Sequence, residues 1–139
     1  MPGHLPDAPP MLNPDFRDIL SEFIDAEVRF LIVGAYALAA HGLPRATGDL
    51  DFWIALAPEN ADRILRALDR FGTPLEGLSA ADLQEPGVVV QIGREPSRVD
   101  IMTTIDGVDF EEAWDERLDI DLDGLDVPVP EGVTPSPAP

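Results

Sequence analysis

Cysteine and lysine are both missing from this chain of 139 residues, and all nine of its basic residues are arginine. Without cysteine the chain has no disulfide, no thiolate ligand for a metal and no cysteine nucleophile. Against the nine arginines stand 27 aspartate and glutamate residues, which give a formal net charge of −18. Such a chain repels nucleic acid and anionic membrane at long range, and a basic protein partner would be attracted to it.

Long hydrophobic runs are also missing. The longest apolar stretch, residues 30–40, is too short to span a bilayer and is interrupted by Gly34. Residues 1–10 are rich in proline and lack the apolar segment of a secretory signal. We therefore expect a cytoplasmic protein with no membrane partner.

The length and the hydrophobic content of 45% fit one globular domain. We expect a flexible leader over residues 1–13, a domain over residues 14–130 and a disordered, proline-rich tail over residues 131–139.

The hydrophobic pattern predicts helices and strands in alternation. Apolar residues at spacings of three and four predict helices, and continuous or alternating apolar runs predict strands. Helices are expected at 14–24, 35–41, 58–71 and 110–114, and strands at 29–33, 49–56, 88–92, 98–103, 118–122 and 127–129. This order predicts an α/β (α+β) fold, a mixed β-sheet flanked by helices.

Two carboxylates, Asp49 and Asp51, stand at the start of a predicted strand with one residue between them. Side chains alternate along a strand, so both carboxylates project from the same face. Two carboxylates held this close repel each other unless a cation lies between them. Oxygen ligands of this kind suit Mg²⁺, and a pair can bridge two metal ions during phosphoryl or nucleotidyl transfer.

The spacing alone is weak evidence, because a chain with 27 acidic residues contains several such pairs by chance. Two further pairs share residues 119–123, where alternation with leucine and isoleucine predicts the solvent-facing side of an antiparallel strand. A third candidate carboxylate, Asp100, lies between two β-branched core residues on another predicted strand. Its alternative interpretation is a solvated residue paired with Arg98 or Arg94.

The residues around the first pair resemble a known family. The family pattern is an apolar strand, a glycine that opens a helix, the motif h-P-R-x-T-x-D-h-D, in which h is hydrophobic, and a later aspartate on a strand. Residues 43–51 (LPRATGDLD) match the motif at every defined position, and residues 31–35 (LIVGA) match the strand and its glycine. The chain thus resembles the nucleotidyltransferase superfamily that includes DNA polymerase β, and more narrowly the AbiEii-like bacterial nucleotidyltransferases. The resemblance covers about residues 15–130, and its specificity lies in residues 31–54.

The resemblance implies a role for each matching residue. Gly34 and the backbone of Ala35 would cradle a triphosphate at a helix N-terminus. The metal ions, Mg²⁺ or Mn²⁺, would be held by three carboxylates, those of Asp49, Asp51 and Asp100, and Asp100 would also help to activate the attacking hydroxyl. Arg45 and Thr47 would hold the loop or contact phosphate, and a structural ion pair is the alternative for Arg45.

The implied activity is a metal-dependent transfer of a nucleoside monophosphate from a nucleoside triphosphate to a hydroxyl on RNA or protein. Some members of the similar family are toxins of toxin–antitoxin pairs. This chain differs from the family pattern in having Ala35 at the second glycine or serine position. It also lacks a C-terminal helix with lysine or arginine. The alternative function is therefore a catalytically weak or inactive binding or regulatory module that acts with a basic partner.

Overall fold

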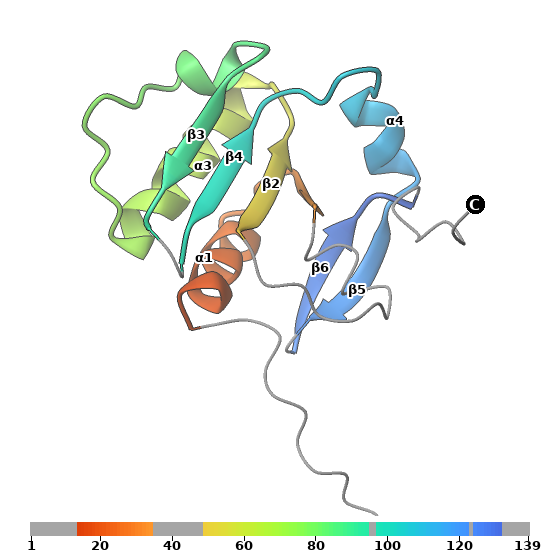
Figure 1. Cartoon of the computed structure of the whole chain (residues 1–139), viewed down its shortest axis with the longest axis horizontal. Helices are drawn as coiled ribbons and strands as arrows, with labels where there is room; N and C mark the ends of the chain where they lie inside the picture. Colours follow the sequence, from red (N-terminus) through yellow and green to blue (C-terminus); the bar gives the residue numbers. More distant parts are fainter. Residues whose placement is uncertain (1–13, 35–48, 95–96, 123, 132–139) are drawn as a thin grey trace, which may run out of the picture.

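The computed structural model of this chain describes residues 14–34, 49–94, 97–122 and 124–131. Within these residues lie two long helices, two short helices and six strands, most of which are labelled in Figure 1. In chain order they are α1 (Pro14–Asp25), β1 (Phe30–Val33), β2 (Leu50–Ile54), α3 (Pro58–Phe71), the 3-10 helix η1 (Asp82–Gln84), β3 (Val89–Ile92), β4 (Val99–Met102), α4 (Phe110–Asp115), β5 (Leu118–Leu122) and β6 (Leu125–Val129).

Four of the strands form one sheet in the order β1-β2-β4-β3. The central pair, β2 and β4, is parallel, and the two outer pairs are antiparallel. The predicted mixed sheet with flanking helices is therefore confirmed. Because β2 lies between β1 and β4, its residues Asp51, Phe52 and Trp53 have register partners on both sides.

One face of the sheet carries the main hydrophobic core. Alternate residues of β2 point to this face and pack against the helices α1 and α3, which lie together behind the sheet in Figure 1. Three aromatic rings meet there: Phe52 lies 4.4 Å from Phe23 and 5.2 Å from Phe30 between ring centroids. Burial of such rings supplies a large share of the stabilisation of a small domain.

The other face of the sheet receives the remaining residues of β2, because side chains alternate along a strand. Near the end of β2, Trp53 packs there with Leu31 and Val33 of β1. The short helix α4 covers this part of the face through Phe110 and Trp114, and Phe110 meets the indole of Trp53 edge to face at 5.1 Å. Closer to the start of β2, the same face carries Asp51.

The last two strands form a separate antiparallel hairpin. The solvent-facing position of Asp119 and Asp121 is confirmed, since both residues are exposed. One detail differs from expectation: Leu118 was expected on the buried side but is 36% exposed, because it stands at the open end of the hairpin. Val127 and Val129 pair back with β5 as expected, and both are fully buried because β6 packs into the main core.

Several sequence predictions lie outside the described residues. These are the helix at 35–41, the loop at 43–48, the leader and the tail beyond residue 131. In the part of the chain that is described, no helix has the length and apolar character needed to cross a membrane.

The buried side chain of Asn60 connects the residue just before β1 with the residue just after β2. Its Oδ1 accepts a hydrogen bond from the backbone N–H of Arg29 at 2.7 Å, and its Nδ2 donates to the carbonyls of Arg29 and Ala55. Asn60→Ala leaves the N–H of Arg29 and the carbonyl of Ala55 without this partner, while the carbonyl of Arg29 still accepts from the N–H of Ala55. We therefore expect the free energy of unfolding to fall by about 2–4 kcal/mol in urea denaturation. The exposed Arg66→Ala on the same helix is the control, with an expected change within about 0.5 kcal/mol. Equal effects of the two substitutions would contradict this assignment.

Candidate active site

The parallel pairing of β2 with β4 places two carboxylates side by side. Asp51 and Asp100 are register partners, and both project from the face opposite the main core. Neighbouring strands lie about 4.8 Å apart, so these two side chains are immediate neighbours. Asp49 stands just before the first residue of β2, on the same side. All three carboxylates that the sequence singled out are thus brought together at one end of the parallel pair.

Gly34 lies directly beside this group. It follows Val33, the residue of β1 that is paired with Asp51, and its φ of +76° is a conformation that side chains other than glycine rarely adopt. A Cβ atom at this position would overlap Oδ2 of Asp51. The absence of a side chain therefore gives Asp51 its space, and the sequence analysis had assigned Gly34 only to phosphate binding.

A guanidinium lies between two of the three carboxylates. Nε of Arg98 is 3.2 Å from Oδ2 of Asp49 and 3.3 Å from Oδ1 of Asp100, and its Nη2 is 3.3 Å from Oδ2 of Asp100. The alternative expected for Asp100, a solvated residue paired with Arg98 or Arg94, is met in part: its carboxylate pairs with Arg98 but is only 14% exposed. Asp100 also flanks Asp51, and its role in holding a metal stays a prediction.

Sequence reasoning missed the contact between Arg98 and Asp49. A signal for it was present: residues two apart on a strand share a face, so Arg98 had to lie on the side of Asp100. Which other carboxylate it would reach depends on the pairing of β4 with β2, which the sequence did not specify.

The crowding of the carboxylates changes the acidity of one of them. Burial, followed by the nearby charges of Asp100 and Asp49, raises the pKa of Asp51 from 3.8 to about 6, and Arg98 opposes this rise. Like charges and partial desolvation both disfavour the ionised form. The raised pKa shows that a negative charge on Asp51 is unfavourable in this position.

The kind of ligand and the charge of the group suit an oxygen-preferring divalent cation such as Mg²⁺ or Mn²⁺. Three carboxylates and one guanidinium leave two formal negative charges, and like-charge crowding on Asp51 is relieved when a cation binds. Within residues 14–34, 49–94, 97–122 and 124–131, however, no three acidic or histidine side chains are arranged to hold an ion as they stand. In the present arrangement Arg98 takes up oxygens of Asp49 and Asp100.

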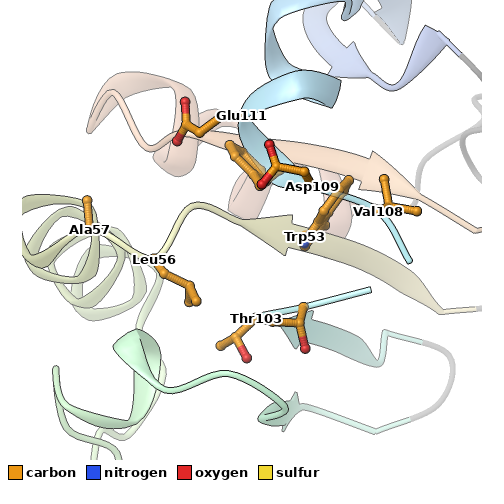
Figure 2. Close-up of a pocket in the computed structure, with 9 residues that line it drawn as sticks. Trp53, Leu56, Ala57, Thr103, Val108, Asp109 and Glu111 are labelled. Carbon is orange, nitrogen blue, oxygen red and sulfur yellow. The ribbon is translucent and has the colours of Figure 1, made fainter. Parts of the chain in front are cut away.

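Two hollows open beside Trp53, and none of the three carboxylates lines either of them. The first, of about 320 Å³, is bounded by Trp53, Leu56, Thr103 and Asp109, among others (Figure 2). The second, of about 410 Å³, shares Trp53 and Asp109 with it. Trp53 is 2% exposed, and its indole N–H has no hydrogen-bond partner in the described part of the chain. Apolar walls with a few acidic groups suit the uncharged part of a substrate better than its phosphates.

The remaining predicted site residues, Ala35, Arg45 and Thr47, lie outside the described residues. Their assigned roles in binding phosphate and holding the loop stay predictions.

Comparison with known proteins supports the fold. No family model matches the chain, and no curated protein sequence matches it. Solved structures do match, and one of them is the crystal structure of a candidate nucleotidyltransferase from Thermotoga maritima. That chain has 18% sequence identity and a TM-score of 0.57, and the match covers 87% of this chain and 80% of the Thermotoga chain. The chain therefore shares the fold of that structure.

The raised pKa of Asp51 predicts a pH-dependent gain in stability from Asp51→Asn. The folded chain holds this proton more tightly than the unfolded chain. The proton on Asp51 therefore stabilises the folded chain fully below pH about 4, and this stabilisation is lost as the pH rises through about 6. We expect Asp51→Asn to raise the free energy of unfolding at pH 7.5 by about 1–2 kcal/mol, allowing for partial exposure, and to have little effect below pH 4.

Urea denaturation across this pH range in metal-free buffer measures the gain. The control is Asp119→Asn, which removes an exposed carboxylate of a pair with the same spacing. A gain from Asp51→Asn that does not vary with pH would contradict the assigned cause.

The contact between Gly34 and Asp51 predicts a second effect. Gly34→Ala combines an unfavourable positive φ with an overlap on the carboxylate, so we expect a loss of about 2–4 kcal/mol in the free energy of unfolding. Gly72→Ala is the matched control, because Gly72 has a φ of +97° and no atom within 4 Å of the added Cβ; about 1 kcal/mol is expected there. When Asp51→Ala is added to Gly34→Ala, the part of the loss that exceeds that of Gly72→Ala should disappear, because the overlapping carboxylate is gone. An unchanged loss in the double variant would show that the overlap is unimportant.

Proposed function

We propose that this chain is a metal-dependent nucleotidyltransferase that moves a nucleoside monophosphate from a nucleoside triphosphate to an acceptor hydroxyl. The observation that carries the proposal is the register of β2 and β4, which brings Asp51 beside Asp100. On a nucleotidyltransferase fold, this group of carboxylates is the arrangement best suited to such chemistry.

In this reaction the acceptor oxygen forms a bond to the α-phosphorus, and the bond from that phosphorus to the pyrophosphate oxygen breaks. Bound Mg²⁺ or Mn²⁺ supplies charge stabilisation at the phosphates. We assign Asp49, Asp51 and Asp100 as its ligands, and Asp100 as the group that receives the proton of the attacking hydroxyl. The absence of a side chain at Gly34 makes room for the carboxylate of Asp51 in this group.

The hollows beside Trp53 offer a place for the uncharged end of a substrate. Acidic groups line both hollows, Asp109 with Glu111 in the first and Asp109 with Glu112, Glu116 and Glu131 in the second, and they disfavour phosphate there. The apolar walls favour a flat ring or an apolar side chain. The acceptor is proposed to be RNA or protein. A net charge of −18 favours a protein acceptor or a basic partner that brings the acceptor to the site.

The motif at residues 43–51 supports a narrower proposal, an AbiEii-like enzyme with a role in a toxin–antitoxin pair. A basic antitoxin would be attracted to a chain of this charge.

A second function is favoured by one specific observation. As the described residues stand, Arg98 occupies two of the three carboxylates and no three ligands converge. This arrangement is also expected of a nucleotidyltransferase fold that has lost catalysis and serves as a binding or regulatory module.

Label transfer tests the proposal. The purified chain is incubated with Mg²⁺ or Mn²⁺, each α-labelled nucleoside triphosphate in turn, and a panel of RNA and protein acceptors. We expect transfer by the wild-type chain and a loss of about 100-fold or more in Asp51→Asn and Asp100→Asn, because each carboxylate contributes to the charge balance at the reacting phosphate.

The matched controls are Asp119→Asn and Asp121→Asn, which alter an exposed pair of the same spacing and should retain full transfer. Transfer that survives Asp51→Asn would overturn the enzyme proposal. If metal and nucleotide raise the melting temperature of the wild type without any transfer, the binding module is the better description.

A further inference from the structure

The outer strand β3 presents one side of its backbone to solvent. The N–H of Thr103 donates to the carbonyl of Val88 at 3.0 Å, so the backbone of Val88 faces β4. Residues alternate along an antiparallel pair, so Val90 also bonds to β4, whereas the N–H and C=O groups of Val89 and Gln91 point away from it. Among the described strands none pairs with this side of β3, as Figure 1 shows.

This edge lacks the features that usually keep a strand from pairing with another chain. Edge strands of natural proteins carry charged residues, proline or a bulge for this purpose. Residues 89–92 (VVQI) contain no charge and no proline, and their register with β4 is continuous. Val89 is 57% exposed, whereas all four residues of β1, the other outer strand of this sheet, are buried. Of the two outer strands, β3 is therefore the one that is open to a further strand.

A groove lies beside this edge. It has a volume of about 640 Å³ and is bounded by residues 88–93 on one side and by residues 71–74 and 76–78, at and after the end of α3, on the other. Of the described residues that line it, the charged ones are Glu76 and Asp82, and both are acidic. A groove with a strand edge and acidic groups favours an extended, positively charged segment.

Charge and composition distinguish between the segments that could occupy this groove. A second copy of the chain brings another net charge of −18, which opposes the pairing of two such edges. The chain's own end segments, residues 1–13 and 132–139, contain prolines at short intervals, and proline cannot donate to a strand ladder. A basic segment of another protein meets neither obstacle.

We propose that the edge of β3 is a docking site for an extended, basic segment of a partner protein, which joins the sheet as an additional strand. Its backbone bonds to the outward groups of Val89 and Gln91, and Glu76 and Asp82 favour its positive charge. Because Gln91 is the register partner of Asp100, the docked segment lies beside the strand next to the candidate active site. The inference does not depend on the proposed transfer of a nucleotide.

Amide hydrogen exchange, followed by NMR, tests this edge residue by residue. In the free chain the N–H groups of Val89 and Gln91 should exchange fast, and those of Val90 and Ile92, which bond to β4, should be protected. The probe is an end-blocked peptide of about eight residues that alternates arginine and valine. At saturation it should slow exchange at Val89 and Gln91 by about tenfold or more, because both N–H groups then donate to the added strand.

Two matched peptides separate strand pairing from charge attraction, with affinities measured by isothermal titration calorimetry at low ionic strength. Glutamate in place of arginine reverses the charge and should weaken binding by about tenfold or more, because the chain is acidic. Methylation of the peptide's backbone nitrogens keeps the charge and removes the N–H donors. It should also weaken binding by about tenfold or more, because the strand can no longer donate to the carbonyls of Val89 and Gln91.

Two variants of the chain test the same surface. Gln91→Pro removes one outward N–H at an edge position where proline is tolerated, and it should weaken binding of the arginine–valine peptide by about tenfold. Glu76→Gln removes one exposed charge and should weaken binding by about twofold to threefold, with a smaller effect at high salt. The control is Asp62→Asn, exposed on α3 and outside the groove, which should leave the affinity unchanged. The melting temperature of each variant confirms that it folds.

Absence of binding, or binding that leaves exchange at Val89 and Gln91 as fast as in the free chain, would overturn the proposal. Equal binding of the methylated peptide would reduce the interaction to charge attraction. Protection of both N–H groups in the chain alone would also overturn it. Protection that is lost on dilution assigns the edge to a second copy, and protection that is lost when residues 1–13 or 132–139 are removed assigns it to the chain's own ends. Label transfer enters none of these outcomes, so this proposal and the proposed function fail separately.

Discussion

The parallel pairing of β2 with β4 is the constraint on which the rest of the site depends. It sets Asp51 and Asp100 side by side, and it brings Arg98 within reach of Asp49 as well as Asp100. A shift of one residue in this register would turn one strand's carboxylate into the hydrophobic core and its neighbouring apolar side chain out. The apolar residues of both strands therefore fix the position of the charged ones.

The site also contains two features that are energetically unfavourable in the folded chain. Crowded carboxylates raise the pKa of Asp51, and Gly34 adopts a positive φ beside it. Such features persist when the surrounding structure is stable enough to hold them. Here the aromatic cluster of Phe23, Phe30 and Phe52, on the opposite face of the same strands, supplies that stability. Core and site are two faces of one short sheet.

The net charge of the chain does not describe the charge at the site. A net charge of −18 suggests a surface hostile to any anion. Yet the structure concentrates three carboxylates and one arginine at a single point, where bound divalent cations would reverse the local sign.

The sequence by itself determined the elements and much of the site. Alternation along residues 50–54 and the periodicity of 58–71 predicted β2 and α3, and the motif around Asp49 and Asp51 separated that pair from the exposed pairs at 119–123. These features are local, so spacing and side-chain type are enough to read them. Only the tertiary structure decided that Arg98 bridges Asp49 and Asp100, that Asp51 needs the space left by Gly34, and that Val127 and Val129 are buried. Each of these depends on which strands are neighbours and in what register, and contacts between residues far apart in sequence leave no periodic signal along the chain.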